Sequence, residues 1–210
     1  VVGWGEPKYR AAQLMSWIYR KRVSTFEAMT NLSKEFREKL TVAASVSEAY
    51  TTACTASDHD AATKYLFGLA NGDRVESVLM HDKDRTTVCI SSQVGCAMAC
   101  DFCATGKMGF FRNLTASEIL DQFTALEKEL RREKSVTNIV FMGMGEPLHN
   151  YEAVSRSIEW FSSADAYKFS PRRITVSTVG IIPKIRELVN DHPQVRLAVS
   201  LHSAIQSTRN

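Results

Sequence analysis

The sequence predicts an α/β protein in which parallel β/α units follow a small helical and β accessory region. Three observations support this prediction. Apolar residues recur at helical spacing up to about residue 44, β-branched runs separated by turn residues fill residues 47–92, and strands alternate with helices from residue 115 onward. Alternation of this last kind is typical of parallel sheets whose strands are joined by helices.

Residues 7–44 are expected to form short amphipathic helices, and Ser33 is the candidate N-cap of the third. A basic group, residues 20–22, separates the first two helices. Such a group can meet phosphate, but it is more often a solvated helix end. The apolar positions at three-to-four spacing are Tyr9, Leu14, Trp17, Ile18, Phe26, Met29, Leu32, Phe36 and Leu40.

Four β-rich runs follow, at residues 49–56, 63–70, 74–82 and 86–92. Asn71 and Gly72, between the second and third runs, form a strong hairpin signal. We therefore divide the chain into an N-terminal helical accessory domain (1–46), a β-rich connecting region (47–84) and a core (85–210).

From residue 115 the expected order is helix 115–134, strand 138–142, helix 151–162, strand 173–177, helix 182–189 and strand 196–201. Thr115 and Glu118 form a capping box in sequence, so the first of these helices has a defined start. The segment before it joins a strand to a helix. In parallel β/α folds such loops lie on the face that carries the chemistry.

Composition limits the class of protein. The 210 residues contain no apolar run near the roughly 18 residues needed to span a bilayer, and the N-terminus lacks the pattern of a secretory signal. We expect a soluble monomer of the cytoplasm or an organellar interior, with no membrane partner. The net charge of +3 is small, so any affinity for nucleic acid must come from local patches.

Three of the five cysteines, Cys96, Cys100 and Cys103, lie within eight residues, which favours metal or redox chemistry over a disulfide scaffold. The spacing C-x3-C-x2-C lets one loop supply three ligands to a cubane iron–sulfur cluster and leaves the fourth iron free to bind a substrate or cofactor. The alternatives are a zinc site completed by a distant histidine, or three unligated thiols.

This cysteine motif, with Phe102 before its last cysteine, resembles the signature of radical S-adenosylmethionine (SAM) enzymes. The segments "VCISSQVGCAMACDFCATGKMGFFRNLTASEILDQ", "NIVFMGMGEPLHNYEAV", "ITVSTVGIIPKI" and "LAVSLH" together resemble the RlmN/Cfr group of adenosine methyltransferases. The start "GEPKYRAAQLMSWIY" extends the resemblance over nearly the whole chain. It implies a partial (β/α) radical SAM barrel, a [4Fe-4S] cluster held by Cys96, Cys100 and Cys103, and S-adenosylmethionine as the second cofactor.

The resemblance also implies which residues bind S-adenosylmethionine. The "GMGEP" segment corresponds to the part of the family that binds the amino group, and its glycines allow close backbone approach to a ligand. The ends of "ITVS" and "LAVSLH" correspond to contacts with the ribose and the methionine carboxylate. A lone histidine in such a place would more often be structural. The matching positions are Gly145, Glu146, Ser177, Ser200, Leu201 and His202.

Two further positions match catalytic residues of the family. Cys89 corresponds to the cysteine that deprotonates the covalent RNA–protein intermediate, and Glu76 to a proton acceptor or substrate-orienting carboxylate. From pattern alone, Cys89 would be a small buried hydrophobe and Glu76 an outward-facing strand charge. Cys54 matches no family motif.

The function implied by the resemblance is methylation of carbon 2 of an adenosine in 23S rRNA, with tRNA as a further substrate, through a 5′-deoxyadenosyl radical and a methyl-cysteine intermediate. Methylation of carbon 8, as in Cfr, and a different radical SAM reaction remain open. No cysteine follows Cys103, and "SAIQ" after His202 departs from the family pattern. We therefore expect a fragment; a chain truly ending at Asn210 would be a non-catalytic cluster-carrying or RNA-binding remnant.

The implied partners are RNA and an electron donor such as a flavodoxin or ferredoxin. Phosphate contacts would give affinity for RNA, and a flipped adenosine would give specificity. Most of the candidate cations are individually more typical of ordinary surface charges. The candidates are Lys8, Arg10, Arg20, Lys21, Arg22, Lys107, Arg112, Arg172 and Arg173.

Overall fold

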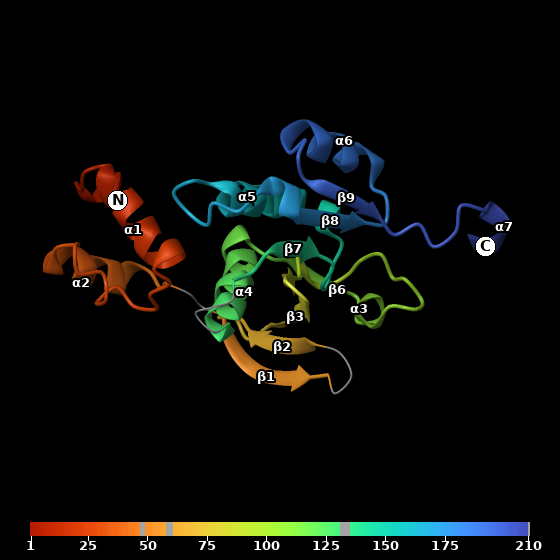
Figure 1. Cartoon of the computed structure of the whole chain (residues 1–210), viewed down its shortest axis with the longest axis horizontal. Helices are drawn as coiled ribbons and strands as arrows, with labels where there is room; N and C mark the ends of the chain where they lie inside the picture. Colours follow the sequence, from red (N-terminus) through yellow and green to blue (C-terminus); the bar gives the residue numbers. More distant parts are fainter. Residues whose placement is uncertain (47–48, 58–60, 131–134, 210) are drawn as a thin grey trace.

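The computed structural model describes residues 1–46, 49–57, 61–130 and 135–209. Its centre is a seven-stranded mixed sheet in the order β1-β2-β3-β4-β7-β8-β9, in which β1 to β4 pair antiparallel and β4 to β9 pair parallel. Figure 1 shows the N-terminal helices at one end of the molecule and the C-terminal α7 at the other. The predicted α/β fold is confirmed.

The N-terminal region has its own hydrophobic core. It contains the 3-10 turn η1 (Val2–Trp4), α1 (Tyr9–Met15), the π-helical turn η2 (Ser16–Arg20) and α2 (Lys34–Ala43). The Ser33 hydroxyl accepts a hydrogen bond from the Phe36 amide, which confirms the predicted N-cap. The second of the expected helices, between the basic group 20–22 and Ser33, does not form. Consecutive turns form there, and they still bury Phe26, Met29 and Leu32 with α2.

The β-rich runs form β1 (Tyr50–Ala56), β2 (Ala62–Gly68), β3 (Arg74–Asp82) and β4 (Arg85–Cys89). β2 and β3 pair antiparallel across the loop that contains Asn71 and Gly72, as the hairpin signal predicted. β3 and β4 also pair directly, with Asp82 opposite Arg85. The sheet therefore continues across residues 84 and 85, and the division into three regions stays a prediction.

The segment between β4 and the next long helix forms a small separate hairpin. It contains β5 (Gln93–Gly95), α3 (Ala104–Lys107) and β6 (Phe110–Asn113). Helix α4 (Ala116–Glu129) follows, and its predicted capping box is present. The helix ends before the predicted residue 134, because Leu130 is extended; residues 131–134 lie outside the described residues.

The predicted alternation of strands and helices is confirmed in the rest of the chain, with boundaries that differ by at most two residues. The elements are β7 (Asn138–Phe141), η3 (Pro147–Asn150), α5 (Tyr151–Ser162), η4 (Pro171–Arg173), β8 (Ile174–Thr178), α6 (Ile182–Asp191), β9 (Arg196–Val199) and α7 (Gln206–Arg209). None of the helices within the described ranges is long and apolar enough to cross a membrane.

One face of the sheet builds the main core. Val88, Ile139 and Ile174 lie side by side in register on β4, β7 and β8, and each is fully buried. This face packs with Phe123 of α4 and Val154 of α5 in one apolar cluster. Because side chains alternate along a strand, the residues between these point to the opposite face, which is where the candidate site begins.

The N-terminal region docks on the main core through polar and aromatic contacts. Arg22 forms a 2.7 Å ion pair with Glu127 of α4, and the ring of Tyr19 lies 5.0 Å from that of Tyr167. The Arg20 guanidinium donates to the carbonyl of Ala164. Burial raises the pKa of Glu127, while Arg22 lowers it. Arg20 and Arg22 are thus engaged internally, although each is a candidate for RNA contact.

Candidate functional site

Three of the expected site residues share the face of the sheet opposite the main core. Cys89 at the end of β4 lies opposite Val78 on β3 and Val140 on β7. Glu76 is two residues before Val78, so its side chain points to the same face. The register of β7 and β8 places Ser177 on this face as well. The tertiary fold thus brings the two expected catalytic side chains onto one surface with an expected cofactor residue.

Cys89 is held as a neutral thiol. Its side chain is buried, and burial raises its pKa to about 11, although a backbone hydrogen bond at Met142 opposes the shift. At neutral pH the thiolate is therefore a small minority of the population.

Glu76 is half-exposed, and its carboxylate forms a 2.9 Å ion pair with Lys64 of β2. The backbone of Glu76 contacts two other segments of the chain. Its carbonyl accepts a 2.5 Å hydrogen bond from the Ser91 hydroxyl, and its amide lies 3.3 Å from the Met144 sulfur. The position of Glu76 is thus tied to the two loops that follow β4 and β7.

The three clustered cysteines lie in the loop between β5 and α3. Cys96 is buried and Cys100 and Cys103 are half-buried; all are free thiols. Burial raises the pKa of the Cys96 thiol, and Cys100, Glu146 and Cys103 raise it further, so these three groups lie within electrostatic range of Cys96. Within the described residues no group of three Cys, His, Asp or Glu forms a preformed metal site. By donor chemistry the loop fits an iron–sulfur cluster, since thiolates are its usual ligands.

The segment after β7 brings Glu146 to the same edge of the sheet. Glu146 is almost fully buried, and its two carboxylate oxygens accept hydrogen bonds from the amides of Leu148 (3.0 Å) and Val179 (2.9 Å). Gly145 has φ +98°, and a Cβ there would meet the side chain of Gln93 at 2.5 Å. This position therefore requires glycine for both its backbone conformation and the close packing.

The ends of β8 and β9 meet as the sequence predicted. The hydroxyls of Ser177 and Ser200 lie 3.2 Å apart. His202, with φ +60°, stacks on Phe102 of the cysteine loop with ring centroids 5.9 Å apart and planes inclined by 11°. Leu201 is exposed. The "SLH" segment is thus in direct contact with the loop that carries the cysteines.

Three buried amide side chains at this site did not emerge from the sequence. Gln93 accepts from the Glu146 amide, Gln122 of α4 bonds both the amide and the carbonyl of Ser91, and Asn150 donates to the carbonyls of Ser92 and Leu114. One available signal was the polar Gln122 on the apolar face of its helix. Nothing comparable distinguishes Gln93 or Asn150.

Comparison with known proteins now decides the family. A family model described as the radical SAM superfamily matches residues 90–208, which includes the cysteine loop, "GMGEP" and "SLH". The chain belongs to the radical SAM superfamily. Residues 1–46 match a second model, the ribosomal RNA large subunit methyltransferase N-terminal domain.

Two relatives of this radical SAM protein have the same name. The chain is 46% identical over 210 residues to the dual-specificity RNA methyltransferase RlmN of Geotalea uraniireducens (strain Rf4), and 44% identical over 209 residues to that of Syntrophobacter fumaroxidans (strain DSM 10017 / MPOB). In both cases all of the chain matches 60% of the relative. The resemblance to the RlmN group is therefore confirmed, and the chain spans about 60% of the length of these relatives.

A solved structure agrees. The crystal structure of a radical SAM methyltransferase from Sphaerobacter thermophilus superposes with a TM-score of 0.92 at 44% identity. The superposition covers 96% of this chain and 60% of that one. The fold of the radical SAM core described above is thus the fold of a solved relative.

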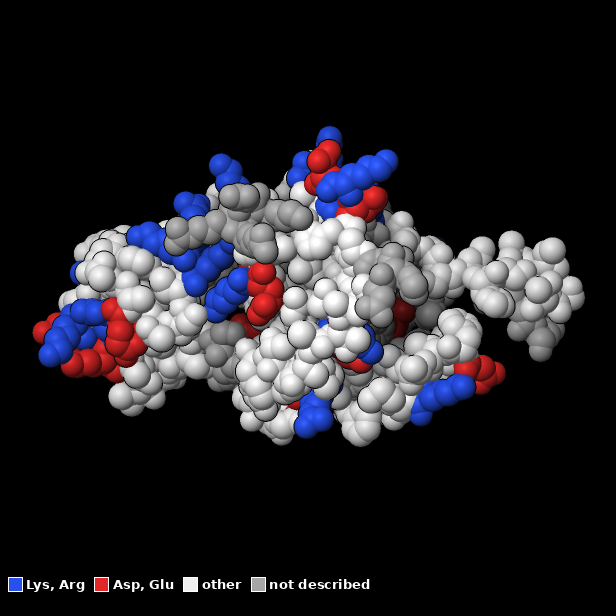
Figure 2. Space-filling model, turned by 60° about the horizontal axis from the view of Figure 1, so that its bottom comes forward, with Lys and Arg blue, Asp and Glu red and all other residues white. Residues whose placement is uncertain are grey.

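One candidate cation, Lys107, lies in α3 directly after the cysteine loop. On the face drawn in Figure 2 several basic side chains gather toward the end where the N-terminal helices lie, and others lie elsewhere on this face. Arg112 is occupied, because it bonds Asp73 at 2.6 Å and both carboxylate oxygens of Glu118. A polar depression of about 530 Å³ at the amino-terminal ends of β4, β7, β8 and β9 has a lining of mixed charge, with the cations Lys83, Arg85, Arg173 and Arg196 and the carboxylates of Asp82 and Asp84.

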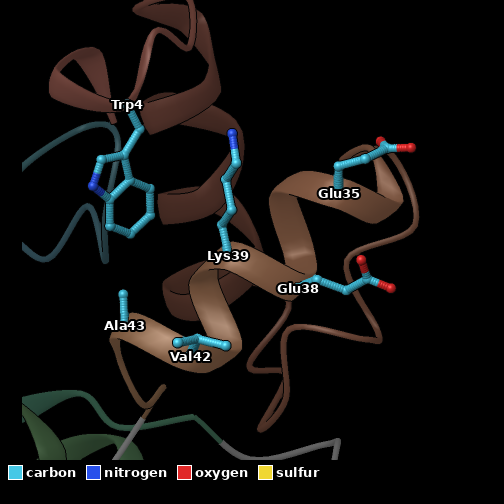
Figure 3. A pocket seen from close by; sticks show the side chains of 6 residues that line it. All are labelled: Trp4, Glu35, Glu38, Lys39, Val42 and Ala43. Carbon is cyan, nitrogen blue, oxygen red and sulfur yellow. The ribbon is translucent and has the colours of Figure 1, made fainter.

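A second cavity, of about 660 Å³, lies in the N-terminal region between η1 and α2. Figure 3 shows the indole of Trp4 on one side and the side chains of Lys39, Val42 and Ala43 on the other. The carboxylates of Glu35 and Glu38 turn away from the indole. This cavity is remote in sequence from every predicted site residue.

Proposed function

We propose that this chain carries the catalytic core of a radical SAM methyltransferase that acts on carbon 2 of an adenosine in 23S rRNA and tRNA. One observation carries the proposal: the cysteine loop, Glu146 and "SLH" meet at one edge of the sheet, and Glu76 and Cys89 lie on the adjoining face. Relatives named RlmN support carbon 2 over carbon 8.

The loop residues would hold the cofactors. Cys96, Cys100 and Cys103 would supply three thiolate ligands. The carboxylate of Glu146 would accept hydrogen bonds from the amino group of S-adenosylmethionine through lone pairs that the backbone amides leave free. When bound, the cluster supplies the electron that starts radical chemistry on S-adenosylmethionine. Such chemistry is required because the amidine carbon of adenine offers no nucleophilic lone pair to a polar methyl donor.

The ends of β8 and β9 would complete the cofactor site together with Gly145. The hydroxyls of Ser177 and Ser200, which lie 3.2 Å apart, would bind the ribose and the methionine carboxylate. His202 and Leu201 close the site against the cysteine loop, since His202 already stacks on Phe102.

Cys89 and Glu76 would handle protons and orient the substrate. Because burial holds Cys89 as a thiol, its action as a proton acceptor requires that bound RNA change its surroundings. Glu76, whose carboxylate forms an ion pair with Lys64, would orient the adenine amino group. We further propose that the complete mechanism passes through a methyl-cysteine supplied from outside residues 1–210.

The test is methylation by the anaerobically purified full-length protein, using 23S rRNA and tRNA from cells that lack the modification. Mass spectrometry of the digested RNA distinguishes 2-methyladenosine from 8-methyladenosine. We expect 2-methyladenosine from the wild type and from Cys54→Ala, because Cys54 is exposed on β1 at the edge of the sheet. We expect none from Cys100→Ser. The appearance of 8-methyladenosine, or product from Cys100→Ser, would contradict the proposal.

A further inference from the structure

Gln93 connects the root of the cysteine loop to the segment that carries Glu146. It lies on β5, three residues before Cys96, and is completely buried. Its amide oxygen accepts a 2.8 Å hydrogen bond from the backbone amide of Glu146. Its amide nitrogen donates to the Asn113 side-chain oxygen at 2.8 Å and lies 3.2 Å from Nδ1 of His149.

These contacts fix Glu146 from three directions. Gln93 holds its backbone amide, and the amides of Leu148 and Val179 hold its two carboxylate oxygens. The stem of Gln93 also fills the space beside Gly145, where a Cβ would be 2.5 Å from Gln93 Cβ and 2.7 Å from Cγ. The side chain of Gln93 therefore both fills the gap beside Gly145 and bonds across it to Glu146, next to the backbone hydrogen bonds that the amides of Ser92 and Gln93 donate to the Met144 carbonyl.

We infer that Gln93 is a positioning residue that holds Glu146 against the cysteine loop and thereby sets the affinity for S-adenosylmethionine. This inference rests on the proposed function, in which Glu146 and the loop bind the same ligand molecule. A ligand that must reach both groups binds most tightly when their separation is fixed before it arrives. Gln93 does not touch the ligand; it acts through Glu146.

The chemistry of the glutamine amide can be dissected by substitution. Glutamate keeps an acceptor for the Glu146 amide but loses the donor toward Asn113. Methionine keeps the length and the packing but leaves the Glu146 amide without its partner, and a buried amide without a partner is costly. The order of affinity for S-adenosylmethionine should be wild type, then Gln93→Glu, then Gln93→Met.

Gln122 provides a matched control, because it is a buried amide outside the contacts that hold Glu146. It is also completely buried, and its amide bonds Ser77, Ser91 and Glu118, but it does not touch Glu146. Gln122→Met should therefore lower stability in the same manner as Gln93→Met without the same effect on the cofactor site.

The experiment uses the full-length protein with its cluster reconstituted anaerobically. Equilibrium dialysis gives the Kd for S-adenosylmethionine, electron paramagnetic resonance reports the change in the cluster signal on its addition, and iron content and melting temperature are recorded for each variant. We expect Gln93→Met to raise the Kd about tenfold at unchanged iron content. We expect Gln93→Glu to recover most of this loss, and Gln122→Met to keep the wild-type Kd within about twofold.

Equal Kd values for Gln93→Met and Gln122→Met would make Gln93 merely structural and would overturn the inference. The inference would also be overturned if Gln93→Glu bound S-adenosylmethionine no more tightly than Gln93→Met, because the hydrogen-bond acceptor for the Glu146 amide would then not affect the Kd. A wild-type protein that binds S-adenosylmethionine but methylates no adenosine would refute the proposed function and leave the role of Gln93 intact. Loss of iron from Gln93→Met would place its effect on the cysteine loop and would also contradict the inference.

Discussion

The packing of Gly145 against Gln93 makes a quantitative prediction. In Gly145→Ala the new methyl group would lie 2.5 Å from Gln93 Cβ and 2.9 Å from the backbone nitrogen of Gln93, and the residue would keep φ +98°. The unfavourable backbone conformation costs about 1–2 kcal/mol, and overpacking against a rigid neighbour adds about 1–3 kcal/mol. The free energy of unfolding should therefore fall by about 2–5 kcal/mol.

Gly180 is the matched control. It also has a positive φ, +114°, but a Cβ there would meet nothing within 4 Å. Gly180→Ala should therefore lose only the backbone contribution, and the difference between the two variants reports the contact with Gln93. A difference of about 2 kcal/mol corresponds to about 4–8 °C in melting temperature for a chain of this size.

The assay is thermal unfolding of both variants by scanning calorimetry at matched pH, with urea unfolding as the second measure. Equal losses in Gly145→Ala and Gly180→Ala would refute the reasoning, because the close approach of Gln93 would then carry no cost.

Three further predictions concern the surroundings of the site. Burial raises the pKa of Cys89 to about 11, whereas the pKa in the unfolded chain is near 9, so at alkaline pH the unfolded chain binds fewer protons than the folded one. The free energy of unfolding should therefore fall between about pH 9 and pH 11. Urea unfolding of Cys89→Ala should lack that part of the fall. Gln122→Met leaves the backbone of Ser91 without its side-chain partner and should lose about 2–4 kcal/mol in urea unfolding; an unchanged midpoint would show that the amide contributes nothing. Arg112 lowers the pKa of both Asp73 and Glu118. These ion pairs therefore stabilise the fold at pH values above the ordinary pKa of the two carboxyl groups, and the stabilisation is lost as the pH falls. In Arg112→Gln, the free energy of unfolding should differ less between pH 7 and pH 3 than in the wild type.

Local sequence signals predicted most of the elements. The capping box at Thr115 and Glu118 and the N-cap at Ser33 are present because each is decided by residues three apart on one helical turn. The prediction was wrong for residues 26–32, where turns reproduce the three-residue spacing of a helix. These turns bury Phe26, Met29 and Leu32, and a helix with the same apolar spacing is also expected to bury one face, so the spacing could not distinguish the two.

Motifs predicted which residues belong to the site, but not how they are joined. The Ser177–Ser200 contact and the stack of His202 on Phe102 agree with the expectation that strand ends meet at one edge. The sequence did not predict the side chains that join the loops. Gln93 and Gln122 carry ordinary polar side chains, and their partners lie 53 and 31 residues away in sequence.

The sequence by itself determined the alternation of strands and helices, the loop with three cysteines and the family, because each depends on residue types at short fixed spacings. Only the tertiary structure decided that Glu76, Cys89 and Ser177 share one face of a sheet, because the face to which each side chain points depends on the register between neighbouring strands. It also decided that Cys89 is a buried thiol and that Arg112 is bound between two carboxylates. Burial and ion pairing are properties of neighbours brought together by folding, and no short stretch of sequence contains them.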